Sequence, residues 1–582
     1  MPQNVVLSDY KPKTVNPPIT IKALCPGAVV LLVLLTLHGC TPGEHDADET
    51  ILVFGGTILT MDEDQPEAEA MVIRGERIEV LGNRADLELL FPNTRRHDLQ
   101  GRVALPGIVD SHTHVHELGH DRNKADLHDV ASVGAMVERL QARYPNPQPG
   151  QWLVGAGWDE GQWASRGYPD RDTLDAAFPD NPVALESLHG FAGFYNGQAL
   201  AAAGVDAETL DPEGGTILRR ADGSPTGVML TLAQGLVTRH IPPETLDEAK
   251  EAILLGLDAL AEVGVTSVHE AGIDPLLIRA FSELADEGRL PIRIYGLLDG
   301  NNDSLMTAWF KMGPFIDPEA FFTVRSIKVF YDGSLGSRTA LLREPYSDDP
   351  GAANPIERIA PEAVASLAQR AVANGFQMAV HAIGDEGNDR TLNVFEEALA
   401  GYPGLDHRWR IEHAQVVLPD YYERAARLGV ISSVQSSHAV GDSPWAEARV
   451  GPERIRHAYA WRRILDGGGS LIVNSDLPGE PWEPVQTLYF AVTRKTLDGQ
   501  PPEGWYADQA LTVEEALRAM TWAGAHAAFQ EDQLGTFAPG YFADFIELDR
   551  DPRHVPPDSL KDLKVVRTWV AGRVWGDDSE SE

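Results

Sequence analysis

Two histidines separated by one residue are the first chemically suggestive feature of the 582-residue sequence. They are His112 and His114, in the stretch Leu105-Pro-Gly-Ile-Val-Asp-Ser-His-Thr-His-Val-His116. Residues 103–110 are apolar with a Pro-Gly pair, which predicts a short buried strand. In extended chain, residues two apart point to the same side, so both imidazoles would face one point. Neutral imidazole is a common ligand for zinc, although two histidines on a solvated strand face would give the same pattern.

Further ligand-type side chains follow at the ends of later candidate strands. They are Lys328, His381, His413 and Asp476. Singly, a strand-end histidine is more often structural than a ligand, and Asp476 in Asn-Ser-Asp-Leu-Pro has the pattern of a turn residue. Lys328 is harder to dismiss, because a lysine inside Ser-Ile-Lys-Val-Phe must desolvate its ammonium group. Together with the His-x-His pair, their order along the chain favours one shared metal site.

The elements that must position these residues alternate between helical and strand patterns. This alternation is typical of βα units around a parallel barrel. After the strand that begins at residue 103, further strands are predicted at residues 265–270, 292–298, 324–332, 377–381, 409–413, 430–435 and 470–476. We therefore expect a (β/α)8 TIM-like barrel over residues 103–530, with the active site at the carboxyl ends of its strands.

Two other regions depart from the barrel pattern. Residues 117–243 form a connection far longer than a usual βα loop, and we expect an inserted subdomain there, over the barrel mouth. Short strand patterns with Gly and Asn turns occupy residues 51–102 and return in residues 531–577. They predict one small β-sandwich built from both termini, followed by an acidic tail at residues 578–582.

The first 40 residues have the composition of a processing segment. Lysines precede an apolar run at residues 23–37, which is too short to span a bilayer comfortably and ends at Leu37-His-Gly-Cys40. This ending resembles a bacterial lipobox. It implies a lipoprotein signal peptide over residues 1–40, lipidation of Cys40 and a polar tether at residues 41–50. Because Thr41 follows the cysteine, the expected location is the outer membrane, facing the periplasm. An uncleaved signal anchor is the alternative.

The formal net charge of -39 limits the classes of partner. Such an acidic chain is not expected to bind nucleic acid or anionic lipid surfaces. The expected partners are a small-molecule substrate and a membrane reached through the lipid anchor, and the oligomeric state is left open. Cys25 and Cys40 are the two cysteines of the sequence, so the processed chain would contain no disulfide and no thiolate metal site beyond the anchor.

The ordered motifs resemble those of the amidohydrolase superfamily. They are Pro-Gly-Ile-Val-Asp-Ser-His-Thr-His, Ile-Lys-Val-Phe-Tyr-Asp-Gly-Ser-Leu-Gly-Ser-Arg-Thr-Ala, His-Ala-Ile-Gly-Asp, Arg-Ile-Glu-His-Ala-Gln and Asn-Ser-Asp-Leu-Pro. The chain is most similar to the YtcJ-like (amidohydrolase 3) branch, which includes N-substituted formamide deformylase, over about residues 50–577. Asn474 and Leu477 depart from this branch, which usually has Gly and Ala there.

The resemblance implies a ligand set and a reaction. The implied metal ligands are His112, His114, His381, His413 and Asp476, and Asp476 is also the implied proton acceptor. Lys328 matches a lysine that is carboxylated in many members and bridges two metals. The implied cofactor is a divalent metal, zinc by expectation, with one or two ions per chain. The implied reaction is hydrolysis of a non-peptide amide-type C–N bond by a metal-activated hydroxide, with N-acyl and N-formyl amines as candidate substrates.

Four residues are candidates for orienting the substrate: His189, Asp332, Arg338 and His438. For each, an ordinary loop hydrogen bond is an equally open interpretation. Two alternative functions also remain: a mononuclear deaminase of the same superfamily, and a catalytically inactive, lipid-anchored binding protein. Lys328 favours the binuclear hydrolase over the deaminase, which characteristically lacks this lysine.

Overall fold

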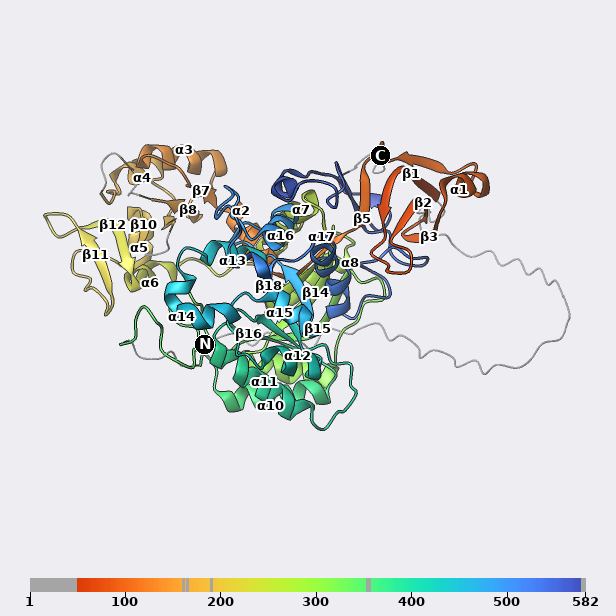
Figure 1. Ribbon diagram of the computed structural model, residues 1–582. Helices are drawn as coiled ribbons and strands as arrows, with labels where there is room; N and C mark the ends of the chain where they lie inside the picture. The colour runs from red at the N-terminus through yellow and green to blue at the C-terminus, as the bar shows by residue number, and fades with distance from the viewer. Residues whose placement is uncertain (1–49, 160–162, 164–166, 189–191, 352–356, 577–582) are drawn as a thin grey trace. The chain divides into compact units, whose positions relative to one another are not determined.

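Eight parallel strands form a nearly closed barrel in the described part of the chain (Figure 1). The computed structural model describes residues 50–159, 163, 167–188, 192–351 and 357–576. The strands are β6 (Ile108–Thr113), β13 (Val265–Ile273), β14 (Arg293–Asp299), β15 (Phe322–Phe330), β16 (Gln377–Ala382), β17 (Arg410–His413), β18 (Ile431–Gln435) and β19 (Ser470–Asn474). Their hydrogen-bonded order follows the chain, and a parallel bridge between Thr113 and Leu477 brings the two edges together. The predicted α/β barrel is confirmed.

Helices cover the outside of these strands. They include α7 (Leu246–Glu262), α8 (Pro275–Asp286), α9 (Asp303–Met312), α10 (Pro361–Ala373), α11 (Asp385–Leu399), α12 (Tyr421–Leu428), α15 (Trp461–Asp466), α16 (Pro484–Thr493) and α17 (Val513–Ala519). By contrast, α18 (Trp522–Ala527) packs against side chains of β6, β18 and β19. Figure 1 shows α10, α11 and α12 running along one outer side. The largest hydrophobic cluster lies between strands and helices and includes Val268, Phe281 and Ile327. Strands that are buried on both faces consist of nearly continuous apolar residues. Their positions could be predicted for this reason.

The strand predicted at residues 103–110 is two strands that belong to different sheets. Val103–Pro106 is β5 and pairs with β1 (Thr50–Leu59) and β20 (Phe545–Leu548), whereas the barrel begins with β6. The break falls at Pro106-Gly107. Proline has no amide hydrogen to donate to a ladder, and a Cβ on Gly107 would lie 2.0 Å from Thr266 Oγ1. A side chain at position 107 would therefore collide with β13, and glycine allows the close approach.

Strands from both ends of the chain form one sheet of eight strands, where a small β-sandwich built from both termini was predicted. The N-terminal strands are β1, β2 (Glu67–Arg74), β3 (Arg77–Gly82), β4 (Arg95–Asp98) and β5, with α1 (Arg84–Leu90) beside them, and the C-terminal strands are β20, β21 (Val565–Val570) and β22 (Arg573–Val574). The red and blue ribbons of Figure 1 mark these two origins. Asp544 precedes β20 and forms a buried ion pair with Arg293 of β14, at 2.6 and 3.0 Å. This pair ties the sheet to the barrel.

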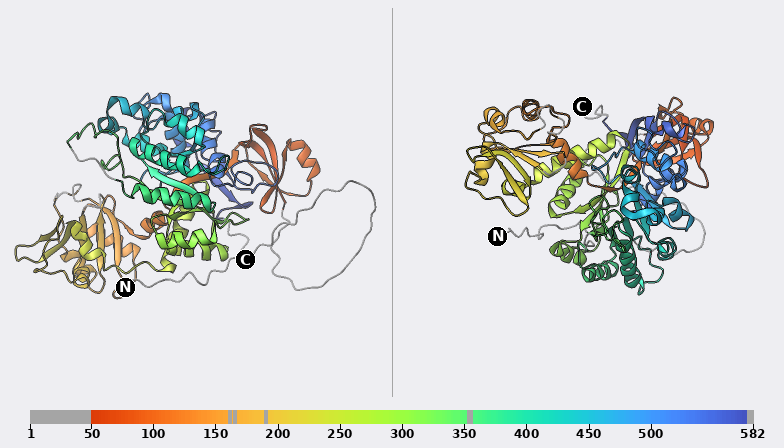
Figure 2. Two further views of the ribbon diagram at one scale, coloured as in Figure 1. Left: turned by 90° about the horizontal axis from the view of Figure 1, so that it is seen from below. Right: turned by 60° about the vertical axis from the view of Figure 1, so that its left-hand side comes forward.

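The long connection after β6 contains a third sheet. Its strands are β7 (Ala125–Asp126), β8 (Leu153–Trp158), β9 (Val183–Ser187), β10 (Ala192–Tyr195), β11 (Gly215–Arg219) and β12 (Pro225–Thr231), and its helices are α3 (Val133–Arg143), α4 (Asp172–Ala177), α5 (Gly197–Ala203) and α6 (Gly235–Thr238). Trp158 and Phe194 belong to a hydrophobic cluster formed within this connection. Figure 2 shows the insert, coloured orange to yellow, from two directions. The predicted insertion is therefore confirmed as a unit with its own sheet and core.

None of the helices among the described residues is long and apolar enough to cross a membrane. The predicted signal peptide with Cys40, the tether up to residue 49 and the tail at residues 578–582 lie outside the described residues.

Candidate metal centre

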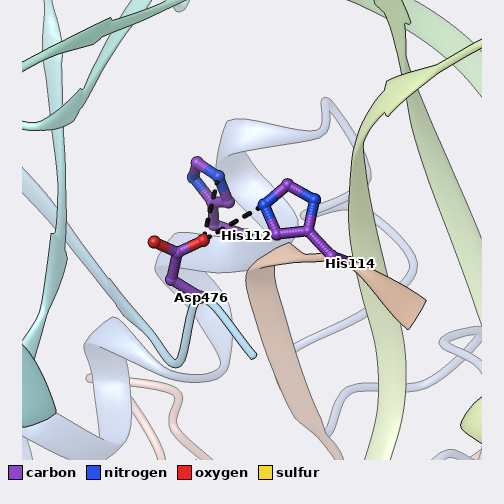
Figure 3. Close-up of side chains that lie close together, drawn as sticks. All are labelled: His112, His114 and Asp476. Atoms are coloured by element: carbon purple, nitrogen blue, oxygen red, sulfur yellow. Dashed lines mark ion pairs between the residues drawn. The ribbon is translucent and has the colours of Figure 1, made fainter. Parts of the chain in front are cut away.

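Two histidines at the carboxyl end of the first barrel strand converge on an aspartate that follows the last barrel strand. His112 is the penultimate residue of β6, His114 precedes helix α2 (Val115–Asn123), and Asp476 lies two residues after β19. The Nε2 atoms of His112 and His114 are 3.4 and 3.3 Å from Asp476 Oδ1. Figure 3 shows both imidazoles beside this carboxylate. The convergence predicted from the His-x-His spacing is therefore present, although the strand ends at Thr113.

The second oxygen of Asp476 faces another pair of histidines. His413 Nδ1 and His438 Nε2 lie 3.9 and 3.7 Å from Asp476 Oδ2. Among the described residues, two groups have ligand atoms close enough to hold a metal ion, His112 with His114 and Asp476, and His413 with His438 and Asp476. His413 and Asp476 have φ angles of 77° and 56°. Such strained backbone in non-glycine residues clusters at functional sites. Asp476 is thus the residue that the two groups share.

Lys328 lies against the same centre. It belongs to β15, is 1% exposed, and its Nζ is 3.0 Å from His112 Nε2. Burial lowers the pKa of Lys328 to about 8, against the attraction of Glu412 and Asp476. An ammonium group this close to candidate metal ligands would repel a cation. The position therefore suits a neutral or chemically modified amine better than a plain ammonium.

His381 contributes a buried nitrogen that has no hydrogen-bond partner among the described residues. Its Nε2 is 3.1 Å from the carbonyl oxygen of Gly333, whereas its Nδ1 is the unpartnered atom. Its ring centroid is 4.4 Å from that of His413. Burial lowers the pKa of His381 to about 3, so the ring is neutral. A neutral, buried and unpartnered nitrogen is what a metal ligand requires.

Glu412 orients His112 from behind. Its Oε2 accepts a hydrogen bond from His112 Nδ1 at 2.6 Å, and its Oε1 lies 2.8 Å from Arg410 Nε. Burial raises the pKa of Glu412, but the charge of Arg410 and the hydrogen bond from His112 outweigh it and hold the pKa well below the usual range. Because Nδ1 carries the proton, the lone pair of His112 is on Nε2, toward Asp476. A carboxylate behind a histidine is a common device for orienting metal ligands.

His413 is held in a similar way by amide groups. Gln435 accepts a hydrogen bond from His413 Nδ1 at 2.8 Å and donates one to Asn474 Oδ1 at 2.7 Å. Asn474 in turn donates to Ser433 Oγ at 2.8 Å. Asn474 stands where the YtcJ-like branch usually has Gly. Its side chain therefore completes a hydrogen-bond chain that fixes the orientation of His413.

Two further carboxylates fix the backbone at the ligands. Glu270, in β13, accepts hydrogen bonds from the amide of Val115 and the hydroxyl of Thr113, at 2.7 and 3.0 Å. Asp110 accepts from the amide and hydroxyl of Ser475, at 3.1 and 2.6 Å. The residues on either side of His114 and the residue before Asp476 are thus anchored by buried acids.

The donor set fits a divalent metal of the zinc type. It consists of imidazole nitrogens and a carboxylate, which suit zinc and similar ions. Burial lowers the pKa of both His112 and His413, so these imidazoles are neutral. Neutral imidazoles and an ionised carboxylate are the protonation states that metal binding needs.

Comparison with known proteins identifies the chain. The sequence profile of the amidohydrolase family matches residues 96–575. The chain belongs to the amidohydrolase family. YtcJ of Bacillus subtilis (strain 168) is 32% identical to it over 89% of this chain and 98% of YtcJ. N-substituted formamide deformylase of Arthrobacter pascens is 27% identical, over 90% of this chain and 97% of the deformylase.

A solved structure supports the same assignment. An uncharacterised metal-dependent hydrolase from Pyrococcus furiosus has a TM-score of 0.73 and 29% sequence identity to this amidohydrolase, over 87% of this chain and all of the other chain. The resemblance inferred from the motifs is therefore confirmed, and the amidohydrolase is a metal-dependent hydrolase.

The four candidates for substrate contact have different surroundings in this amidohydrolase. His438 lies beside Asp476, whereas His189 is outside the described residues. Asp332 is fully buried and accepts hydrogen bonds from the amides of Leu341, Ile383 and Gly384, at 2.8 to 2.9 Å. These are ordinary hydrogen bonds to loop amides, which is the interpretation that the sequence left open beside a role in orienting the substrate.

Arg338 is also engaged by its own chain. Its guanidinium is 2.9 Å from Asp348, and its side chain is 37% exposed. This contact, too, is an ordinary loop interaction rather than a contact with the metal centre.

Sequence reasoning missed Arg410, Glu412 and Gln435. A usable signal was present in Arg410-Ile-Glu-His413, because charged residues inside a barrel strand must be paired. The same argument singled out Lys328. What the pattern did not contain was the identity of the partner, His112, which is 300 residues away in the chain.

Proposed function

We propose that this amidohydrolase hydrolyses a non-peptide, amide-type C–N bond at a zinc centre of one or two ions held by the residues around Asp476. One observation carries the proposal. The two carboxylate oxygens of Asp476 face two separate pairs of histidines, one oxygen to each pair. Lys328, in contact with His112, supplies a further ligand-type group at this centre.

The residues of the chain have separate roles in the proposed reaction. When bound, the metal lowers the pKa of a water molecule from about 15.7 to about 7 and polarises the substrate carbonyl. Asp476 takes a proton from the attacking water and passes it to the leaving nitrogen. His438, whose Nε2 is 3.7 Å from Asp476 Oδ2, is placed to contact the substrate near that proton. Glu412 and Gln435 keep His112 and His413 in position.

N-acyl and N-formyl amines are the proposed substrate class. One relative, at 27% identity, is named as an N-substituted formamide deformylase, and this similarity supports amide hydrolysis here. The proposed products are a carboxylic acid, which is formate for an N-formyl substrate, and a free amine.

A substrate screen tests the proposal. The purified protein, loaded with zinc, is incubated with a panel of N-formyl and N-acyl amines and with dipeptides, and released amine and acid are quantified by liquid chromatography and mass spectrometry. We expect equal amounts of amine and acid from members of the amide panel, and less than a tenth of that rate from dipeptides. Release of ammonia from amidine-type substrates, with no amide cleaved, would instead identify a deaminase.

We also propose that the protein is a lipoprotein of the bacterial outer membrane, attached through Cys40 and facing the periplasm. The support is the sequence Leu37-His-Gly-Cys40 after an apolar run, with the polar residues 41–49 as a tether. A periplasmic location would give small amides access to the centre without entry into the cytoplasm.

A further inference from the structure

A second cluster of ligand-type side chains lies on α2, apart from the centre at Asp476. The chain reads His116-Glu-Leu-Gly-His120, which places two histidines four residues apart on one face of the helix. Their ring centroids are 5.9 Å apart. Glu244 comes from the segment that returns from the insert, and both of its carboxylate oxygens are 2.9 Å from His116 Nε2. The carboxylate thus contacts one imidazole at the base of the insert, and the second imidazole lies one helical turn away on the same face of α2.

Close helix packing holds this cluster in place. A Cβ on Gly119 would lie 1.6 Å from the carbonyl oxygen of Ala252 in α7, and one on Gly256 of α7 would lie 2.3 Å from that of Val115. The two helices therefore approach each other through glycine at both points, which leaves little room for movement. Glu244 precedes the N-cap residue of α7, whose capping box fixes the backbone there. The histidines and the carboxylate are consequently carried by two elements locked together.

His120 is the member of this cluster whose ring is not held by a hydrogen bond. Within the described residues, no group forms a hydrogen bond with its ring nitrogens, and its side chain is partly exposed. Burial lowers the pKa of His120, as does the nearby charge of Lys124, against the attraction of Glu244 and Asp121. The ligand atoms of this cluster do not all lie within 4.8 Å of one another, unlike the two groups around Asp476. The His120 ring must turn to complete a site, and it loses no hydrogen bond in doing so.

We propose that His116, His120 and Glu244 bind a second divalent transition metal, of the zinc type, at a site distinct from the centre at Asp476. Two imidazole nitrogens and one carboxylate oxygen are three ligands suited to such an ion, and water completes the coordination. The ion ties α2, where the chain leaves β6 for the insert, to the segment through which it returns to α7. Its role is to brace the base of the insert. This inference does not depend on the proposed function.

Metal counting on the full-length protein tests the site. Wild type, His120→Ala and Glu244→Gln are dialysed to equilibrium against zinc ions, and bound zinc per chain is measured by inductively coupled plasma mass spectrometry. We expect each variant to bind about one zinc ion fewer than wild type. His554→Ala is the matched control, because His554 is exposed and pairs with an aspartate on the surface. Equal zinc content in wild type and both variants would overturn the proposal and leave an ordinary His–Glu hydrogen bond.

Two further measurements separate metal loss from misfolding. Glu244→Gln keeps the size of the side chain and can still accept a hydrogen bond from His116, so its circular dichroism should match that of wild type. Anomalous diffraction at the zinc edge should show an ion at about 2.0–2.1 Å from ring nitrogens of His116 and His120 in wild-type crystals, and none there in Glu244→Gln. Absence of this peak in wild-type crystals grown with zinc would contradict the site.

Discussion

At the scale of single residues, the metal centre depends on buried charged side chains that each contact more than one partner. Glu412 and Arg410 are both fully buried, and Glu412 links Arg410 to His112. Breaking a buried pair leaves an uncompensated charge, which costs far more than an exposed pair is worth. The orientation of His112 is therefore secured by a group that does not itself face the reaction.

Glu412→Gln should weaken metal binding about 10- to 100-fold, the usual cost of losing a group that orients a metal ligand. The amide can still accept a hydrogen bond from His112 but carries no charge to strengthen it. Competition with a chromophoric chelator measures the affinity, with thermal melts to confirm folding. Glu396→Gln, at a partly exposed surface pair, is the control. Unchanged affinity and turnover in Glu412→Gln would show that His112 needs no such partner.

Asp476→Asn should lower kcat by at least about 10²-fold while largely keeping the metal, because the amide oxygen can still bind it weakly but cannot accept the proton. Steady-state kinetics and metal analysis on the same sample measure the two effects. Asp466→Asn, exposed on α15, should behave as wild type. If Asp476→Asn turns over at nearly the normal rate, the proton is accepted by another group.

Lys328→Ala should lose activity and at least one metal ion per chain. Desolvation and nearby positive charge favour the neutral amine, which can add carbon dioxide to give a carbamate with two ligand oxygens. Millimolar short-chain carboxylic acids should partly restore both properties by filling the vacated space. Metal content and rate are measured with and without acetate, beside Lys250→Ala, a lysine that pairs with two glutamates on the helix surface. Full metal content and turnover in Lys328→Ala would contradict the carbamate bridge.

At the scale of elements, the packing of sheets and helices places the ligands. The barrel strands carry the ligands or end just before them, and buried acids hold the following turns. The terminal sheet is tied to this barrel by the ion pair between Asp544 and Arg293, and Asp544 also accepts a hydrogen bond from the amide of Ala571 at 2.8 Å. One carboxylate thus connects β14 with the start of β20 and with the turn between β21 and β22.

Asp544→Asn should lower the free energy of unfolding by about 3–5 kcal/mol, the cost of leaving one partner of a buried ion pair without its counter-charge. Urea unfolding followed by tryptophan fluorescence measures this change, because Trp569 lies in the same sheet. Asp549→Asn, at a surface pair with Arg550, should change it by less than about 1 kcal/mol. A similarly small change in Asp544→Asn would mean that the buried pair does not stabilise the junction.

At the scale of the whole molecule, one chain carries a barrel, a sheet made from both termini and an insert with its own core. The insert leaves the barrel directly after the His-x-His pair and returns before α7. Any restraint at its base, such as the proposed second metal, therefore acts close to the ligands of the first. The net charge of -39 is compatible with a protein that meets small solutes rather than polyanions.

Cys40→Ser should leave the precursor uncleaved and without lipid, because the thiol is the acceptor of the diacylglyceryl group. Metabolic labelling with a fatty-acid analogue and detergent partitioning measure the modification in cells. Cys25→Ser, at the other cysteine, should be labelled as well as wild type. Equal labelling of Cys40→Ser and wild type would rule out the proposed anchor.

The sequence alone was sufficient for the barrel, the origin of the terminal sheet and the insert. These features are encoded locally: apolar runs mark enclosed strands, and the ends of parallel strands meet at one face, which is why His112, His114 and Asp476 could be grouped from their order along the chain. The position of His438 beside Asp476 was not predicted, and the assignment of these residues as metal ligands stays a prediction. The strand at residues 103–110 was mispredicted as continuous, because an apolar run does not reveal that its two halves pair in different sheets.

Only the tertiary structure decided which buried charges are partners. The pairing of Glu412 with His112, the division of Asp476 between two pairs of histidines and the meeting of Glu244 with His116 all join residues far apart in sequence. Such contacts depend on how the barrel closes and how tightly α2 packs on α7. Residue type and spacing determine that a charge in a strand needs a partner, whereas the closed fold determines which residue that partner is.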